Sequence, residues 1–322
     1  VNQSIMKSNN SIKNETDIIQ DGKQQKDQDT TAHGKDSCPV PGDLQTLIPE
    51  LRQELTKDGD DINLEHVSDD TLLKFLRWKG SVPRAAERFR AHLKWRQETP
   101  WVFDEEPPLL ASQDDELKRL LSCNMLVAPD SLTDKDGCPV LIGRMRNNDM
   151  SDGRTVQDVC RMTIYTMDRM LERLNNRPTT SSNPSDTDED DAAKDGITIF
   201  HDMKGLSRKN VDPSIPKILF RAIIGHFPIR FKQIYILNAP WFFYPMFNVM
   251  SAMFFSAKLR ARTHFIKSVE EIYEVIDSEK LLVEHGGTLD FDSSAWVETQ
   301  IQREKDGSMT SLYSCVEATK KE

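Results

Sequence analysis

The strongest constraint on the fold is a run of 24 residues without a charged side chain, residues 234–257. About 20 apolar residues span a bilayer as one helix, so a transmembrane helix has to be considered. Asn238 and Pro240 interrupt the run early and Pro245 follows, and proline disrupts the interior of a helix. The run therefore predicts a buried strand, a turn and then a helix over residues 241–258 instead of a membrane span.

A second feature of the same region is its charge. Residues 213–269 contain no Asp or Glu and eight Lys or Arg, although the whole protein has a formal net charge of -10. Arg230 and Lys232 are two residues apart, so an extended segment directs both to one face. Each cation near an anionic leaflet contributes about 1 kcal/mol. The pattern favours a surface that meets lipid, with ordinary solvated charge as the alternative, and the acidic composition argues against a nucleic-acid partner.

The helix predicted at residues 241–257 has a broad apolar arc. A helical wheel gathers Tyr244, Asn248 and Ser251 on a narrow polar strip. The arc consists of Phe242, Phe243, Met246, Phe247, Val249, Met250, Met253 and Phe254. One packing face needs a narrower arc, and burial of Phe or Met is worth roughly 1.5–3 kcal/mol per side chain. The arc favours contact with a ligand or a bilayer, and an ordinary core helix is the alternative.

Composition and periodicity divide the chain into four parts. Residues 1–42 are polar, without an apolar period, and predict a disordered tail. Residues 43–115 have helical periodicity and predict a helical module. Residues 116–297 predict an α/β domain, and residues 298–322 predict a flexible tail.

Within the α/β domain the expected strands and helices alternate along the chain. Turn residues 133–137 (TDKDG) predict a hairpin-like connection between the first two strands. The later elements are a helix at 155–174, an acidic loop at 175–196, a strand at 197–203, a helix at 215–227, a strand at 232–238, the helix at 241–258, a strand at 262–266 and a helix at 269–282. This alternation predicts a mostly parallel sheet covered by helices. The loop's acidic residues 186–191 are expected to be solvated, with phosphorylation as the alternative.

The sequence carries none of the common signatures of enzymes or metal sites. Its five cysteines form no CxxC pair, and it has no GxSxG, HExxH, Walker or GxGxxG motif. His201 and Asp202 are adjacent and suit acid–base chemistry, but the sequence marks no nucleophile near them. We therefore expect a protein that is not an enzyme, with no catalytic residues and no metal. No apolar leader opens the sequence, which predicts a cytoplasmic protein with peripheral membrane association.

Five segments follow one another in an order typical of a known family. They are LLKFLRWKG, AAERFRAHLKWRQE, ITIFHDMKGLS with its Asp-x-x-Gly, FPIRFKQIYILNAPWFF with its Asn-x-Pro, and HGGTL with its Gly-Gly pair. Over residues 43–297 the chain resembles the CRAL-TRIO family of lipid-binding proteins. Members include the yeast phosphatidylinositol transfer protein, tocopherol transfer protein and retinaldehyde-binding protein.

The resemblance implies an N-terminal helical bundle followed by a sheet and helices around an apolar lipid pocket. It implies a mobile gate helix that matches residues 241–258, a bound lipid as the ligand and no other cofactor. The implied pocket and gate residues are Trp241, Phe243, Phe247, Met250 and Phe254. The implied phosphoinositide headgroup residues are Lys79, Arg230, Lys232, Lys258, Arg260 and Arg262. The partners implied are thus a hydrophobic lipid and a phosphoinositide-bearing membrane.

The chain also departs from the family pattern. Members that transfer phosphatidylinositol carry Glu at the position of Ile229, which argues against this cargo here. The terminal LDFDSSAW is similar to the lipid-binding module that precedes a non-receptor tyrosine phosphatase, whereas the Cys-x5-Arg signature of that enzyme is absent. We expect a carrier that transfers a lipid between membranes. A membrane-targeting module that senses a lipid without transferring it is the alternative, and a lipid hydrolase ranks third.

Overall fold

The computed structural model describes residues 44–57, 62, 64–65, 67–103, 108–177, 196–309 and 311–312. All of them belong to one compact unit, Cys38–Glu322. The disordered tail expected at residues 1–42 lies outside the described residues. So do residues 178–195 of the acidic loop and residues 313–322 of the expected C-terminal tail.

The N-terminal part of the unit is helical, as the periodicity predicts. A 3-10 turn η3 (Leu44–Leu47) precedes α1 (Ile48–Thr56), α2 (Asp69–Lys79), α3 (Val82–Glu98), α4 (Pro100–Phe103) and α5 (Asp115–Leu121). Ser68 begins α2 by accepting a hydrogen bond from the Thr71 amide, and Gly80 ends it with a φ of 73°. Helix α3 packs against both α1 and α2. The helical bundle of the expected fold class is thereby confirmed.

The remainder is built on a five-stranded sheet. The strands are β1 (Leu126–Val127), β2 (Val140–Arg144), β3 (Ile197–Asp202), β4 (Phe231–Leu237) and β5 (Thr263–Ile266), in the order β1-β2-β3-β4-β5. β1 and β2 are antiparallel, which agrees with the hairpin-like connection, and the other pairs are parallel. The mostly parallel α/β fold is confirmed.

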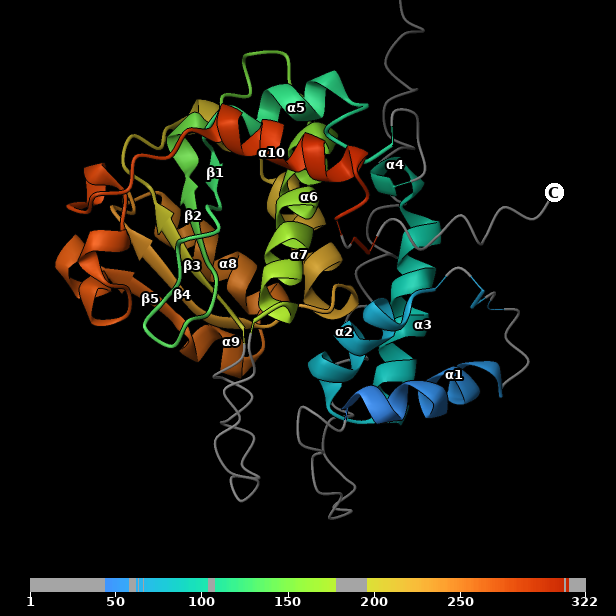
Figure 1. Cartoon of the computed structure of the whole chain (residues 1–322). Coiled ribbons are helices and arrows are strands. Elements are labelled where there is room, and N and C mark those ends of the chain that lie inside the picture. The colour runs from blue at the N-terminus through green and yellow to red at the C-terminus, as the bar shows by residue number, and fades with distance from the viewer. Residues whose placement is uncertain are drawn as a thin grey trace, which may run out of the picture. The chain divides into compact units, whose positions relative to one another are not determined.

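Each face of the sheet has its own hydrophobic cluster. On one face, Leu141, Ile199 and Ile236 pack with α6 (Val156–Asn175), α7 (Ser214–His226) and α8 (Phe243–Phe254). Figure 1 shows α6 and α7 side by side next to the sheet. The other face, with Phe200, is covered by residues of the 3-10 turns η7 (Val269–Glu274), η8 (Ser278–Lys280) and η9 (Val283–His285). These turns replace the regular helix predicted at 269–282, because the backbone is already extended at Asp277 (ψ 124°).

The helix predicted at residues 241–258 is in fact two helices. α8 ends at Phe254 because Phe255 has an extended backbone (φ -94°, ψ 131°). Ser256 then begins a new helix, α9 (Ala257–Ala261), by accepting a hydrogen bond from the Leu259 amide. Among the described helices, none is long and apolar enough to cross a membrane.

The C-terminal segment differs from the expectation of a flexible tail after residue 297. Helix α10 (Ser293–Lys305) continues through it, with Asp292 as the N-cap. Val297 and Ile301 lie one turn apart and are buried. The Glu304 carboxylate accepts hydrogen bonds from the amides of Ala111 (3.0 Å) and Ser112 (2.7 Å) and from the Tyr165 hydroxyl (2.6 Å). These contacts are long-range, so local composition does not reveal them.

Candidate functional site

A cavity of about 220 Å³ lies between the sheet and the helices of its first face. The strands supply its floor, α6 and α7 supply side walls, and α8 covers it. Side chains on its surface include Leu141, Ile199, Ile236, Met167, Leu219, Phe220, Phe243, Met246, Phe247, Met250, Phe255 and Leu259. Nearly all of its surface is apolar, which is typical of a site for a hydrophobic small molecule.

The structure brings three of the five predicted pocket residues to this cavity. Phe243, Phe247 and Met250 line it. Phe254 instead borders a neighbouring cavity of about 600 Å³ beside Trp95. Trp241 lines neither cavity, and 80% of its surface is exposed. Other lining residues were not in the predicted set. Met246 belongs to the apolar arc. Phe255 and Leu259 follow the end of α8, so the helical wheel of residues 241–257 does not describe their directions.

Helix α8 also carries apolar side chains on its outer face. The described residues include five strongly exposed large hydrophobic side chains, and four of them, Trp241, Tyr244, Val249 and Met253, lie on α8 or just before it. Val249 is 60% exposed. Ser251 of the polar strip is buried, and its hydroxyl donates to the Asn248 carbonyl within the helix. The helix is therefore apolar toward the cavity and toward solvent.

Apolar contacts hold α8 in place. Its Phe247 ring packs edge-on against Phe265 of β5 (5.1 Å between centroids) and against Phe255 (5.8 Å). Tyr244 stacks on Phe265 at 4.9 Å. Among the described residues, no hydrogen bond or ion pair joins an α8 side chain to another element. Opening of α8 would therefore break no described side-chain hydrogen bond to another element.

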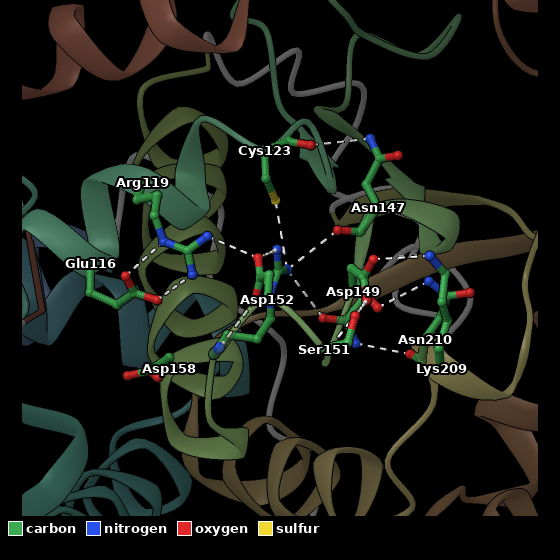
Figure 2. A network of polar contacts seen from close by, with 12 residues as sticks. Glu116, Arg119, Cys123, Asn147, Asp149, Ser151, Asp152, Asp158, Lys209 and Asn210 are labelled. Atoms are coloured by element: carbon green, nitrogen blue, oxygen red, sulfur yellow. Dashed lines mark hydrogen bonds and ion pairs between the residues drawn. The ribbon is translucent and has the colours of Figure 1, made fainter.

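The wall beside the 3-10 turn η6 (Arg208–Asn210) is built differently. Figure 2 shows its polar network, in which Asn210 donates to the Asn148 carbonyl (3.1 Å) and Lys209 pairs with Asp149 (2.9 Å). Asp152 pairs with Arg119 of α5 at 2.8 Å and with the buried Arg154 at 2.6 Å. Charged and polar side chains therefore hold this wall, whereas apolar contacts hold α8.

Lys232 is not a free headgroup cation. It is buried, and its Nζ lies 2.7 Å from Asp134 and 2.6 Å from Asp136. Burial alone would lower the Lys232 pKa, but the hydrogen bonds to both carboxylates outweigh it and raise the pKa. Residues 213–269 contain no Asp or Glu, so the carboxylates that pair with Lys232 come from the β1–β2 connection. Arg230 and Lys232 were expected on one face, but they bind different partners, and the β3–β4 register shifts between Phe231 and Gln233.

Two of the other five predicted headgroup residues donate to backbone carbonyls. Arg230 Nε donates to the Trp78 carbonyl at 3.1 Å, and Arg262 donates to the Phe231 carbonyl at 3.3 Å. Lys79 lies over the Trp78 ring, 4.3 Å from its centroid. Lys258 and Arg260 are exposed on α9. The Arg230 contact joins the start of β4 to the helical module at Trp78, next to Lys79. The Arg262 contact joins the start of β5 to β4. Lys79, Arg230 and Arg262 therefore lie in one region.

His201 and Asp202 do not form an acid–base pair. Neighbouring residues of a strand point to opposite faces, and His201 lines the cavity while Asp202 points away from it. Asp202 accepts from Asn238 (2.8 Å), Arg146 (3.0 Å) and His285 (3.3 Å). Burial would raise the Asp202 pKa, but hydrogen bonds from His285, Asn238, Lys204 and Arg146 outweigh it and hold the pKa well below its usual value.

Asp202 explains three of the sequence motifs at once. It is the Asp of Asp-x-x-Gly, its partner Asn238 begins Asn-x-Pro with a φ of 57°, and its partner His285 directly precedes the Gly-Gly pair. Gly287 has the Leu281 carbonyl so close that an added Cβ would lie 2.0 Å from it. The nearby Glu284 pairs with Arg144 at 2.8 Å and with Arg146. This cluster is therefore an ion-pair network that ties strand ends together.

Comparison with known proteins agrees with this architecture. The model of the CRAL/TRIO domain matches residues 130–287. Phosphatidylinositol transfer protein CSR1 of Eremothecium gossypii is 25% identical over 80% of this chain and 58% of its own length. Clavesin-2 of Homo sapiens is 24% identical over 83% of this chain and 76% of its own. Tyrosine-protein phosphatase non-receptor type 9 of Rattus norvegicus is 23% identical over 81% of this chain, which spans only 41% of that protein.

A solved structure described as the crystal structure of Sfh5 covers 85% of this chain with a TM-score of 0.47 and 14% identity. The domain match covers β2 to β5 and α6 to η9, and so contains most of the cavity and all three motifs that meet at Asp202. The chain therefore carries a CRAL/TRIO domain at residues 130–287.

Proposed function

We propose that this protein binds a hydrophobic lipid in the cavity beneath α8 and transfers it between membranes. The observation that carries the proposal is the two-sided apolar character of α8. Phe243, Phe247 and Met250 face the cavity, while Trp241 and Val249 face solvent. A helix of this kind has an apolar environment to enter when it leaves the cavity, namely a bilayer.

The energetics favour a reversible membrane contact. Burial of one large apolar side chain stabilises by roughly 1.5–3 kcal/mol, so insertion of the outer α8 residues contributes on the order of 5 kcal/mol. This helps to offset the apolar contacts that α8 loses when it opens, and it is far less than a membrane-spanning helix gains. Release after delivery therefore stays possible.

Basic residues beside α8 would select the membrane. Lys258 and Arg260 follow α8 directly, and Lys79, Arg230 and Arg262 extend the positive surface. Each contributes about 1 kcal/mol near an anionic leaflet, so several together decide between membranes. We propose docking on phosphoinositide-bearing membranes through these five residues, without Lys232, whose charge two carboxylates neutralise.

The test is a transfer assay between donor and acceptor vesicles. Extraction of about one lipid per protein from the donor, followed by its appearance in the acceptor, supports the proposal. Replacement of Phe247 and Met250 by Asp should abolish extraction, because charged groups are costly in an apolar cavity. Vesicle binding without extraction by the unaltered protein would contradict transfer and favour a lipid-sensing module.

A further inference from the structure

The cavity contains one polar side chain without a partner. His201 is the penultimate residue of β3 and lies on the same face as Ile199, and both line the cavity. Neither ring nitrogen of His201 makes a hydrogen bond with a described residue, and the Nδ1 atom is buried. A buried polar atom without a partner is rare in folded proteins and calls for a physical explanation.

The backbone of β2 makes room for this ring. Gly143 is the register partner of His201, and a Cβ added to Gly143 would lie 2.3 Å from His201 Nδ1 and 2.8 Å from the Met145 methyl. No side chain other than hydrogen therefore fits at Gly143 with the imidazole in place. Because Nδ1 and Cε1 are the ring atoms nearest to Gly143, the edge with Nε2 is turned away from β2.

The other polar side chains around the cavity already have partners. Asn148 donates to the Asn210 carbonyl at 3.0 Å, and Asn210 donates to the Arg146 carbonyl at 2.9 Å. The Thr163 hydroxyl donates to the Val159 carbonyl at 2.8 Å. Asp212 accepts from the Ser214 amide at 2.8 Å. Within the described part of the wall, His201 is thus the polar side chain left for a guest.

The imidazole is neutral under ordinary conditions. Burial lowers the pKa of His201 to about 4, and no neighbouring carboxylate offsets this effect. A neutral imidazole has one N–H donor and one acceptor nitrogen, so it can pair with a hydroxyl or a carbonyl oxygen. The described lining includes no Lys or Arg, so a carboxylate or phosphate in the cavity would be buried without a counter-ion, which is unfavourable.

We propose that His201 anchors the cargo, which is a neutral lipid with a hydroxyl or carbonyl oxygen on the part that enters the cavity. The inference rests on the proposed lipid-binding function and specifies its ligand class. A pure hydrocarbon would leave His201 Nε2 unpaired, and a lipid with a carboxylate or phosphate group inside the cavity would lack a counter-charge. The apolar remainder of the cargo would contact the surrounding Met, Leu, Ile and Phe side chains.

The experiment measures competition by dodecane and 1-dodecanol for a fluorescent alkyl probe, with the full chain and three variants. His201→Leu removes the hydrogen-bonding group, whereas His201→Gln retains a donor and an acceptor. Ile199→Leu is the matched control, because it changes the same cavity face without changing its polarity. For each protein, the affinity for 1-dodecanol is divided by the affinity for dodecane. The ratio of each variant is then compared with that of the unaltered protein, so that the different water solubilities of the two ligands cancel.

We expect His201→Leu to lower this ratio about tenfold, because a lost hydrogen bond to a buried group has about this effect. His201→Gln should retain part of the preference, and Ile199→Leu should leave it unchanged. If His201→Leu leaves the ratio unchanged while all proteins bind both probes, the anchor is refuted and lipid binding stands. If His201→Leu does not fold, His201→Phe, which keeps an aromatic ring without the ring nitrogens, takes its place: a lowered ratio supports the anchor, and an unchanged ratio refutes it. If the unaltered protein binds neither probe, the proposed function fails together with the anchor.

Discussion

His92 and His201 are both buried as neutral side chains. Burial, aided by the nearby Arg96, lowers the pKa of His92 to about 3, and burial lowers that of His201 to about 4. His92 also hydrogen-bonds to the His226 carbonyl at 2.9 Å, between the helical module and α7. An unfolded chain protonates histidine near pH 6.5, so between that pH and about 4 the unfolded state binds more protons than the folded state. Stability must therefore fall as the pH falls through this window.

We predict that His92→Gln flattens this pH dependence. One buried histidine changes the free energy of unfolding by up to about 1.4 kcal/mol per pH unit. Between pH 6.5 and 5 the unaltered protein should therefore lose up to about 2 kcal/mol more than His92→Gln. Denaturant unfolding at pH 7.5, 6.5 and 5 measures this difference. Parallel curves for the two proteins would show that His92 does not titrate on unfolding.

Sequence reasoning at the level of single residues had mixed success. It correctly predicted the hairpin-like connection at residues 133–137, which joins the antiparallel strands β1 and β2. It considered His201 and Asp202 for acid–base chemistry, although the alternation of a strand places them on opposite faces. It also treated Lys232 as unpaired, because Asp134 and Asp136 lie almost a hundred residues away in the sequence and no local pattern connects them to it.

Among the elements, α10 shows what a local pattern leaves out. Residues 298–305 are rich in polar side chains and give only one buried repeat, Val297 with Ile301, so composition favours a tail. The helix is held instead by Glu304, whose carboxylate satisfies two backbone amides and the Tyr165 hydroxyl. Burial and the proximity of Glu304 raise the pKa of Tyr165, which keeps this hydroxyl protonated as a donor.

We predict that Glu304→Ala lowers the free energy of unfolding by about 1–3 kcal/mol, because it leaves several donors without an acceptor. Glu298→Ala is the matched control on the same helix. Glu298 pairs with Lys118 at 2.6 Å, but both side chains are exposed, so its removal should cost less than about 1 kcal/mol. Denaturant titration of both variants tests this, and equal losses would argue that Glu304 does not fix α10.

Helix α8 offers a test of its outer face with a closely matched control. Val249 on α8 is 60% exposed, and Val283 on η9 is 63% exposed. Val249→Asp should weaken vesicle binding at least about tenfold if α8 inserts, since burial of one such side chain is worth roughly 1.5–3 kcal/mol. Val283→Asp carries the same change away from α8 and should bind vesicles normally. Co-sedimentation with vesicles distinguishes the two, and equal binding by both variants would remove α8 from the membrane contact.

At the scale of the whole molecule, the sequence predicts the fold class because alternation of strands and helices is a repeated local signal. The order of five family-like segments predicts the domain for the same reason. Such local signals do not predict contacts between residues that are far apart in the sequence. Asp202 joins three motifs that are up to 83 residues apart. Lys232 likewise pairs with Asp134 and Asp136, which lie almost a hundred residues away in the sequence. Long-range pairing therefore decides which cations remain available to a membrane.

Charge reversal tests whether the basic residues that follow α8 contribute to membrane binding. Lys258→Glu with Arg260→Glu should reduce binding to phosphoinositide vesicles at least about tenfold, because each cation contributes about 1 kcal/mol near an anionic surface. Arg208→Glu with Lys305→Glu gives the same change in net charge at two exposed positions, on η6 and α10. Specific docking predicts a large loss for the first pair, a small loss for the second, and a difference that shrinks as salt screens the charges. Equal losses would mean that net charge alone governs binding, and the headgroup surface beside α8 would then have to be abandoned.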